Sequence, residues 1–275
     1  MKHARTQAPG VAPARVRRLR GDGEPRDEDD LVAVEAPIEI RMGAGVSTVL
    51  LRTPGDDEDL VRGVLYTEGV VQTLAEIRAI RGLRDPEGDL HGSIVEVDLD
   101  VPAGREPAER FLYSSAACGA CGKVSLGSLA VRGRRSASQL RITRDLLASL
   151  PGRMRDAQKT FGATGGLHAS ALFTAAGDLL SLREDVGRHN ALDKLIGWAL
   201  AAGRIPVEDC VVVLSGRVSY ELMQKSIAAQ IPLVAAVGAP SSLAVDLAAR
   251  FGVTLAGFVR PGSMNVYAGA ERIAG

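Results

Sequence analysis

The sequence predicts an α/β protein in which helices flank a mixed β-sheet, with a β-rich part at the N-terminal end. The chain has 275 residues, and 46% of them are hydrophobic, which is enough to build a sizeable core. After residue 143, short apolar strands alternate with segments of helix length, a pattern typical of parallel strands joined by right-handed crossovers. No apolar run reaches the roughly 18–20 residues that span a bilayer, so no membrane segment is expected.

Charge is balanced over the whole chain but not locally. The 33 Lys and Arg residues match 33 Asp and Glu residues, which excludes a protein that binds nucleic acid through bulk neutralisation of phosphates. Residues 1–20 carry basic and no acidic side chains, whereas residues 21–30 are mainly acidic. This composition, without the apolar core of a signal peptide, predicts a disordered tail over residues 1–30 and a cytoplasmic protein.

Residues 31–113 are expected to form the β-rich N-terminal part. A glycine-rich connection at residues 43–45 separates the first two strands, which suits a hairpin. Acidic residues 56–59 favour the start of a helix, because negative charge is stabilised at a helix N-terminus, and Gly69 ends that helix. The predicted strands cover residues 32–42, 46–52, 77–80 and 93–99.

Residues 128–275 are expected to form the main α/β domain. A helical segment over 143–161, interrupted at Pro151, precedes a hairpin that turns at Ala176-Gly177-Asp178. A helix over 188–202 then leads to three strands that are each followed by a turn. The predicted strands cover residues 168–174, 179–183, 211–214, 233–237 and 254–259, and the later helices cover 220–230 and 243–251.

The turns after the three parallel strands, residues 215–219, 238–242 and 260–263, are candidate parts of a ligand site. Parallel α/β sheets bind ligands outside the carboxyl ends of their strands, and the first two turns lead into helix N-termini, which attract anions. Arg217 and Arg260 add positive charge. Gly, Ser and Pro are also ordinary turn residues, but the three turns together predict a site for a phosphate-bearing ligand.

A second polar cluster covers residues 184–190, between a strand and a helix. Asp185 or Asn190 is suited to cap the helix, whereas Arg188 and His189 are suited to contact a ligand. His168, which follows Thr164-Gly165-Gly166, is a similar candidate. A single His is as readily a hydrogen-bonded structural residue as a ligand contact, so both interpretations stay open.

Two of the three cysteines, Cys118 and Cys121, lie in a stretch of small residues, 114–127, which predicts a flexible loop. A zinc site needs four ligands, and the chain has neither a second such pair nor the His-x-Glu element of the zinc deaminases, so no metal site is predicted. A thiol–disulfide oxidoreductase and a thiolate that carries sulfur as a persulfide both remain open, with Lys123 favouring the thiolate. Cys210 begins an apolar run and is expected to be buried.

Several short motifs occur in an order and spacing that match a known family. They are Arg52-Thr53-Pro54-Gly55-Asp56-Asp57, Thr67-Glu68-Gly69, Cys118-Gly119-Ala120-Cys121-Gly122-Lys123, Thr164-Gly165-Gly166-Leu167-His168, Glu184-Asp185-Val186-Gly187-Arg188-His189-Asn190-Ala191-Leu192-Asp193-Lys194, Leu214-Ser215-Gly216-Arg217, Gly238-Ala239-Pro240-Ser241-Ser242, Gly257-Phe258-Val259-Arg260 and Asn265-Val266-Tyr267. On these motifs the sequence resembles the FdhD family, the formate dehydrogenase accessory sulfurtransferases. The resemblance covers residues 35–267 and leaves the N-terminal tail outside.

The resemblance implies a cytidine-deaminase-like α/β fold, a homodimer and a role as a sulfur carrier. Such a protein takes sulfur from a cysteine desulfurase as a cysteine persulfide. It passes the sulfur to the molybdenum bis-guanine-dinucleotide cofactor, which is then inserted into formate dehydrogenase. The persulfide carrier maps to Cys118, with Cys121 as its assistant. The expected cofactor-binding residues are Phe258, Val259, Arg260, Pro261, Gly262 and Ser263, together with Ser215, Gly216, Arg217 and His189.

Overall fold

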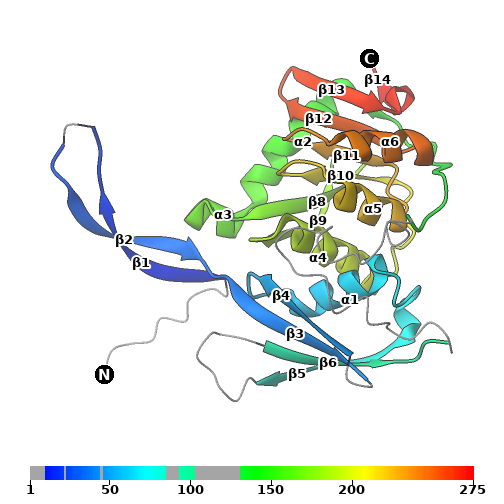
Figure 1. Ribbon diagram of the computed structural model, residues 1–275. Coiled ribbons are helices and arrows are strands. Elements are labelled where there is room, and N and C mark those ends of the chain that lie inside the picture. The colour runs from blue at the N-terminus through cyan, green and yellow to red at the C-terminus, as the bar shows by residue number, and fades with distance from the viewer. Residues whose placement is uncertain (1–9, 22, 44–45, 85–92, 103–130) are drawn as a thin grey trace.

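The computed structural model describes residues 10–21, 23–43, 46–84, 93–102 and 131–275. Cys118 and Cys121, with the whole predicted loop over 114–127, lie outside these residues. The described part consists of a six-stranded sheet covered by helices, a four-stranded sheet next to it, and a hairpin that projects from the body (Figure 1). A short parallel pair, β7 (Ile142–Thr143) with β14 (Ile273–Ala274), joins the two ends of the C-terminal part.

The six-stranded sheet has the order β13-β12-β11-β10-β8-β9. Strands β10, β11 and β12 are parallel, as predicted, and the other three strands run antiparallel to their neighbours. The predicted mixed sheet flanked by helices is therefore confirmed, whereas β13, which follows the third turn, was not predicted. The strands are β8 (His168–Thr174), β9 (Leu179–Asp185), β10 (Cys210–Leu214), β11 (Leu233–Ala236), β12 (Thr254–Arg260) and β13 (Ser263–Ala268).

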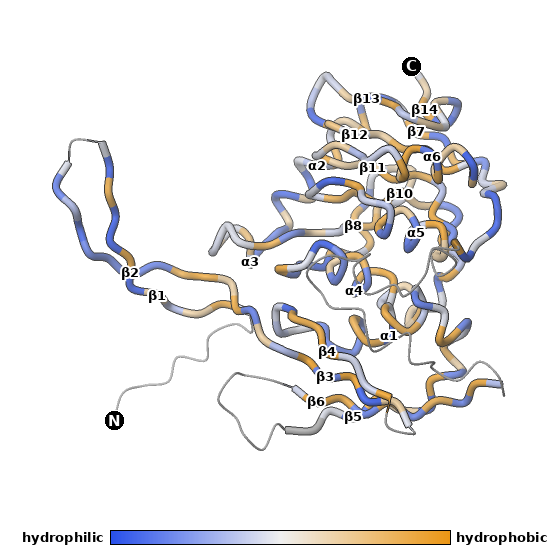
Figure 2. Tube along the Cα trace, in the orientation of Figure 1, coloured by the Kyte–Doolittle hydropathy of each residue, from blue (hydrophilic) through white to orange (hydrophobic). Residues whose placement is uncertain are grey.

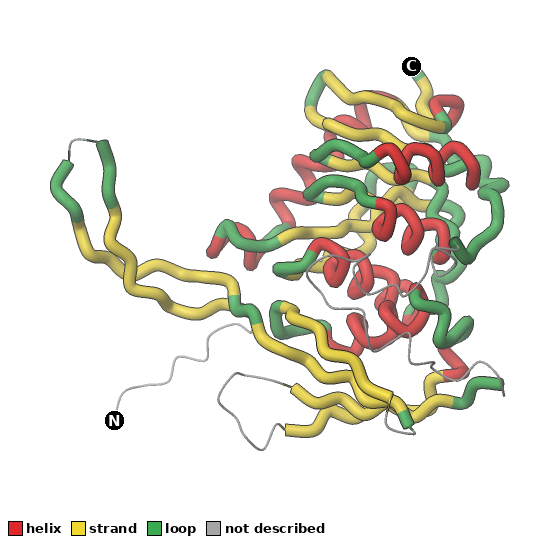
Figure 3. The backbone as a smooth tube through the Cα atoms, in the orientation of Figure 1, coloured by secondary structure: helices red, strands yellow, loops and turns green. Residues whose placement is uncertain are grey.

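Helices cover both faces of this sheet (Figure 3). Val211 and Val213 of β10 pack with Leu150 of α2 on one face, while Val212 and Leu214 face the opposite helix layer. Because successive strand residues point to opposite faces, a continuous apolar strand such as β10 indicates burial on both sides. The helices are α2 (Arg144–Ala157) on the first face and α4 (Arg188–Ala201), α5 (Tyr220–Ala228) and α6 (Ser242–Phe251) on the second.

The four-stranded sheet, of order β4-β3-β6-β5, packs against α1 (Asp57–Thr67). On its other side α1 crosses α4 so closely that the backbones touch. A Cβ atom at Gly63 would overlap the carbonyl oxygen of Asp193, and one at Gly197 would overlap that of Asp59. The strands are β3 (Ala36–Met42), β4 (Val46–Arg52), β5 (Ile77–Arg84) and β6 (Ser93–Leu99), with a short 3₁₀ helix η1 (Leu74–Glu76) before β5 and a second, η5 (Ala270–Arg272), near the C-terminus.

Residues 10–33 correct the prediction of a disordered tail. Strands β1 (Val11–Arg18) and β2 (Arg26–Ala33) form an antiparallel hairpin, hereafter the arm, which projects from the body (Figure 1). The prediction was wrong because it considered the basic and acidic blocks separately, whereas the strand register places them opposite each other. The Arg15 Nη1 atom lies 3.0 Å from Asp29 Oδ1, and Arg18 pairs with Glu28 and Asp30.

The base of the arm rests on α3 (Lys159–Thr164). Gly10 is buried there beside Thr53 and Thr160, and its φ of +99° suits a residue without a side chain. The prediction of an interruption at Pro151 was wrong, because α2 continues through Pro151 and ends at Ala157. The next residue, Gln158, has a ψ of 91° and separates α2 from α3. The change of direction at Gln158 positions α3 beside the arm.

Candidate functional site

The three predicted turns meet at the carboxyl edge of β10, β11 and β12. The backbone N–H of Gly238 donates to Gly216 O at 3.2 Å, and the N–H of Phe258 donates to Gly238 O at 3.2 Å. Gly238 needs to be a glycine, because a Cβ atom there would lie 2.9 Å from both Arg217 N and Gly216 O. Hydrogen bonds between the turns thus fix this edge before any ligand binds.

A cavity of about 620 Å³ opens at this edge, on the α2 side of the sheet. Its walls are mainly apolar, and its polar groups include a His, a Ser and two Arg residues. Such a volume and such a lining are typical of sites for small molecules and cofactors. The lining residues are Pro151, Gly152, Met154, Arg155, Gln158, Phe161, Gly165, Gly166, Leu167, His168, Val186, Ser215, Val237, Val259, Arg260 and Pro261.

The cavity brings together some of the predicted cofactor-binding residues and not others. Val259, Arg260 and Pro261 line it, together with Ser215. Ser215 also ties β10 to β8, because its Oγ accepts the N–H of Ala169 at 2.8 Å. The remaining predicted residues lie on the adjoining turns or behind them, outside the cavity lining. They are Phe258, Gly262, Ser263, Gly216, Arg217 and His189.

Phe258 has an unusual backbone conformation at this edge. Its φ is +51°, in the left-handed region that side chains other than glycine rarely adopt. The register with β13 is irregular between Gly257 and Arg260, and the Phe258 ring is 44% exposed. A conformation of this kind costs free energy, and such residues cluster at functional sites; Phe258 directly precedes Val259 and Arg260, which line the cavity.

The two candidate histidines lie close together but differ in their access to the cavity. His168 lines the cavity, and its ring packs against the backbone of Gly216. His189 lies in the first turn of α4, with its Nε2 atom 3.3 Å from Ser219 Oγ and 3.8 Å from Glu221 Oε2. Burial, together with the positive charge of Arg188, lowers the pKa of His189 to about 4. Burial also lowers the pKa of His168, so both rings are neutral at neutral pH.

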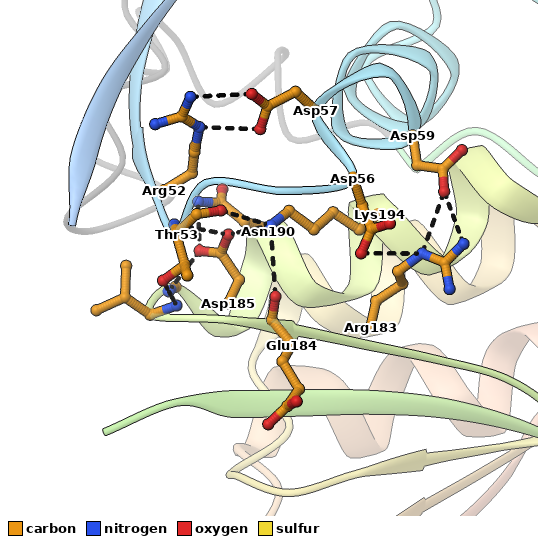
Figure 4. A network of polar contacts seen from close by, with 12 residues as sticks. Arg52, Thr53, Asp56, Asp57, Asp59, Arg183, Glu184, Asp185, Asn190 and Lys194 are labelled. Atoms are coloured by element: carbon orange, nitrogen blue, oxygen red, sulfur yellow. Dashed lines mark hydrogen bonds and ion pairs between the residues drawn. The ribbon is translucent and has the colours of Figure 1, made fainter. Parts of the chain in front are cut away.

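The rest of the cluster at residues 184–190 holds the two parts of the molecule together (Figure 4). Asp185, fully buried, accepts the N–H of Thr53 at 3.0 Å and pairs with Lys194 Nζ at 2.8 Å. Lys194 also donates to Thr53 O, and Asn190 donates to Leu51 O. Neither Asp185 nor Asn190 caps α4, whose N-cap is Gly187 without a side-chain hydrogen bond. Their shared function is to clamp the end of β4 against α4.

Sequence reasoning missed the cavity residues of the α2–α3 segment, of which Arg155, Gln158 and Phe161 carry polar or aromatic side chains. The Arg155 guanidinium lies 3.6 Å from the centre of the Phe161 ring, so the two form a flat stack in the wall. Gln158 is 5% exposed, and its Nε2 atom has no hydrogen-bond partner within the described residues. The segment has the sequence pattern of an ordinary amphipathic helix, and nothing in that pattern indicates that these side chains line a cavity.

The described residues contain no group of three or more His, Cys, Asp or Glu side chains arranged to hold a metal ion. In the same part of the chain, no helix has the length and apolar character needed to cross a membrane. The fold and the site therefore define an α/β protein with a preformed, partly cationic cavity at the carboxyl edge of three parallel strands.

The chain is similar to proteins of one family over nearly its whole length. A family model described as FdhD/NarQ matches residues 33–274. The sulfur carrier protein FdhD of Streptomyces avermitilis is 46% identical over 267 residues, which cover 94% of each chain. The protein of the same name from Sulfurisphaera tokodaii is 42% identical over 249 residues, covering 90% of this chain and 92% of that one. These matches show that the chain belongs to the FdhD/NarQ family.

A solved structure supports the same assignment. The crystal structure of a protein described as a formate dehydrogenase accessory protein, from Desulfotalea psychrophila, matches with a TM-score of 0.73 and 27% sequence identity. The match covers 97% of this chain and all of the other. The resemblance found in the motifs is therefore confirmed at the level of the family.

Proposed function

We propose that this protein carries sulfur from a cysteine desulfurase to the molybdenum bis-guanine-dinucleotide cofactor, in the cytoplasm, before the cofactor enters formate dehydrogenase. The observation that carries the proposal is the cavity beside Arg260, in a chain whose relatives are named sulfur carrier proteins. The cofactor is the substrate of the transfer and is not a resident group. We infer that Cys118 carries the sulfur and that Cys121 assists it.

The composition of the cavity supports a nucleotide as the bound part of the cofactor. Arg260 at the sheet edge provides positive charge for a pyrophosphate. Met154, Phe161 and Val259 form an apolar wall, and the stacked Arg155 and Phe161 present a flat surface of the kind on which a purine base stacks. We infer that the guanine occupies the α2–α3 side of the cavity and the phosphates the Arg260 side.

We further infer that the α/β part has the cytidine-deaminase-like fold implied by the resemblance. The hairpin β8–β9, followed by the three parallel strands β10, β11 and β12 with helices between them, supports this assignment.

The first transfer is a thiol exchange without net oxidation. The Cys118 thiolate attacks the terminal sulfur of the desulfurase persulfide, a new S–S bond forms, and the desulfurase cysteine leaves as a thiolate. In the second transfer the Cys118 S–S bond breaks, and its electron pair stays on the Cys118 thiolate. The terminal sulfur then binds a reduced molybdenum centre, which is oxidised by two electrons as the Mo–S bond forms.

The test is maturation of formate dehydrogenase in the presence of the desulfurase, cysteine and the cofactor. Cys118→Ala is expected to abolish maturation, and mass spectrometry of the unmodified protein is expected to find an adduct of about 32 Da, one sulfur atom, on the peptide that contains Cys118. Cys210→Ala is the matched control, because the Cys210 side chain is buried and burial raises the pKa of its thiol to about 11.

Two other functions give different results in this test. A chaperone that only binds the cofactor would support full maturation after both Cys118 and Cys121 are replaced. A thiol–disulfide oxidoreductase would need a Cys118–Cys121 disulfide, so it would lose activity with Cys121→Ala and show no sulfur adduct. Full maturation by Cys118→Ala would exclude Cys118 as the carrier.

A further inference from the structure

Gln158, in the wall of the cavity, has a side-chain amide that is buried without a partner. The residue is 5% exposed, and its Nε2 atom, a hydrogen-bond donor, has no partner within the described residues. A buried donor without an acceptor costs free energy, so native structures contain few of them. Because Gln158 lines the cavity, a bound ligand can supply the missing acceptor.

The backbone around Gln158 is fixed by hydrogen bonds on both sides. The N–H of Gln158 donates to Arg155 O at 3.2 Å, and Gln158 O accepts the N–H of Gly162 at 3.0 Å. At the start of α3, the N–H of Phe161 donates to Glu184 Oε1 at 2.8 Å. The change of direction between α2 and α3 is therefore a fixed part of the wall, and it presents an amide that still has hydrogen-bonding capacity.

The sheet face behind the cavity is apolar. Strands β10 and β11 consist of hydrophobic residues (Figure 2), and Leu150 and Met154 of α2 pack against this face. An unpaired N–H costs more free energy in apolar surroundings than in water. Gly152 and Gly165 also line the cavity, and a Cβ atom at either would meet nothing within 4 Å. The wall therefore combines an unpaired donor with open space.

We propose that Gln158 distinguishes guanine from adenine in this cavity, by donating a hydrogen bond from its Nε2 atom to O6 of the base. This role rests on the proposed function, which places the guanine on the α2–α3 side. The two purines differ at position 6, where guanine carries an oxygen that accepts a hydrogen bond and adenine an amino group that donates one. Guanine therefore pairs with the free donor, and adenine leaves it unpaired.

The other groups that we place at the nucleotide do not make this distinction. The stacked Arg155 and Phe161 offer a flat surface, and stacking on such a surface tolerates any base. Arg260, on the other side of the cavity, attracts phosphate whichever base is attached. Stacking thus holds a purine, Arg260 holds the pyrophosphate, and Gln158 selects guanine.

The test is isothermal titration calorimetry of the full chain with guanosine diphosphate, adenosine diphosphate and pyrophosphate. The unmodified protein is expected to bind guanosine diphosphate about tenfold more tightly than adenosine diphosphate, because one buried hydrogen bond contributes about that factor. Gln158→Met keeps the length of the side chain and removes its donors. It is expected to weaken the binding of guanosine diphosphate about tenfold and to leave the other two ligands unchanged.

Gln158→Glu separates hydrogen bonding from shape. Glutamate fills the same space as glutamine, but its ionised carboxylate accepts hydrogen bonds and donates none. It is therefore expected to repel O6 of guanine and to accept the amino group of adenine, so that the preference between the two nucleotides is reversed. The affinity for adenosine diphosphate also shows that this variant is folded.

Gln230→Met is the matched control, because the Gln230 amide is paired at both ends. Its Nε2 atom donates to Ile227 O at 2.9 Å, and its Oε1 atom accepts from Arg134 Nε at 2.9 Å. Gln230 lies outside the cavity lining, so this variant should lose melting temperature and keep its affinity for guanosine diphosphate. Gln158→Met should do the opposite, because it removes a buried unpaired group without breaking a hydrogen bond within the protein.

The proposal is overturned if Gln158→Met binds guanosine diphosphate as tightly as the unmodified protein does, or if it weakens all three ligands equally. Equal affinity of the unmodified protein for the two nucleotides also overturns it. If the unmodified protein binds no guanosine diphosphate, the placement of the nucleotide in the cavity is overturned as well. Sulfur transfer by Cys118 is measured separately, through the sulfur adduct, so failure at Gln158 is distinguishable from failure of the sulfur carrier.

Discussion

Two regions of the molecule are rich in polar side chains: the junction between α1 and α4, and the carboxyl edge of the six-stranded sheet. They differ in how far these side chains are buried and paired. At the junction, Lys194 and Asp185 are 1% and 0% exposed and are paired with each other and with backbone groups. At the edge, Arg217 and Arg260 are exposed, and Arg260 lines a cavity.

This difference in burial divides the family motifs into those that stabilise the fold and those that are accessible to a ligand. The motif at residues 52–57 contacts the motif at residues 184–194 through buried hydrogen bonds and ion pairs. These contacts join the four-stranded sheet to the main body. The residues of the turns after β10, β11 and β12 are placed where a ligand can reach them. Predictions at the junction therefore concern stability, and predictions at the edge concern binding.

The largest effect is expected from Lys194→Met. This change leaves the buried Asp185 carboxylate without its cation, and breaking a buried pair from one side costs about 3–5 kcal/mol. The free energy of unfolding is measured by urea denaturation. The control is Arg78→Met, which removes an ion pair of the same 2.8 Å length between side chains that are 58% and 60% exposed, and it should cost less than about 1 kcal/mol. Equal losses in the two variants would show that the junction is not a clamp.

The next largest effect is expected from Gly63→Ala in α1. The added Cβ atom would overlap the backbone of Asp193, so the two helices must separate, at a cost of about 1–3 kcal/mol. Gly152→Ala in α2 is the matched control, because a Cβ atom there meets nothing within 4 Å. A glycine-to-alanine change in an open helix position is expected to stabilise by about 0.5–1 kcal/mol. Thermal denaturation of both variants gives the comparison, and a stable Gly63→Ala would contradict the close helix contact.

The sequence predicted the edge better than the junction. Strand β8 and the turns after β10 and β11 follow from local apolar runs and turn residues, so their positions at one edge could be derived. The clamp joins residues more than a hundred positions apart, such as Thr53 and Asp185, and no local pattern shows that their side chains meet.

The same limit explains the other errors. The charge blocks of the arm indicate order only once the register that opposes Arg15 and Asp29 is known. The wall formed by Arg155 and Phe161 depends on the change of direction at Gln158, which has no Gly or Pro beside it to announce it. Pairing and packing between distant segments, and not local propensity, determine these features.

A binding effect of intermediate size is expected at the edge. Arg260→Ala should weaken the binding of guanosine diphosphate about tenfold, because a guanidinium–phosphate contact is a charge-assisted hydrogen bond. Arg217→Ala, on the neighbouring turn but outside the cavity lining, should weaken it less. Isothermal titration calorimetry of the two variants distinguishes them. Unchanged affinity for Arg260→Ala would remove that residue from the site.

The smallest effect is expected in the pH dependence of stability, which is set in part by His189. Its folded-state pKa is lowered to about 4, mainly by burial, whereas an unfolded His titrates near 6.5. Above pH 6.5 the ring is neutral in both states. As the pH falls from about 6.5 towards 4, the unfolded chain takes up a proton first, so the folded state loses stability, by about 1 kcal/mol at pH 5.5.

His189→Gln should remove this loss, so the melting temperature of the variant should fall less between pH 7.5 and pH 5.5 than that of the unmodified protein. Glu221→Gln is the control. The Glu221 carboxylate raises the pKa of His189 against the effect of burial, so its removal lowers that pKa further. Because the folded-state ring is already neutral at pH 5.5, this variant is expected to keep the pH dependence of the unmodified protein between pH 7.5 and pH 5.5. If His189→Gln also keeps that pH dependence, the neutral His189 ring between Ser219 and Glu221 does not limit stability at acid pH.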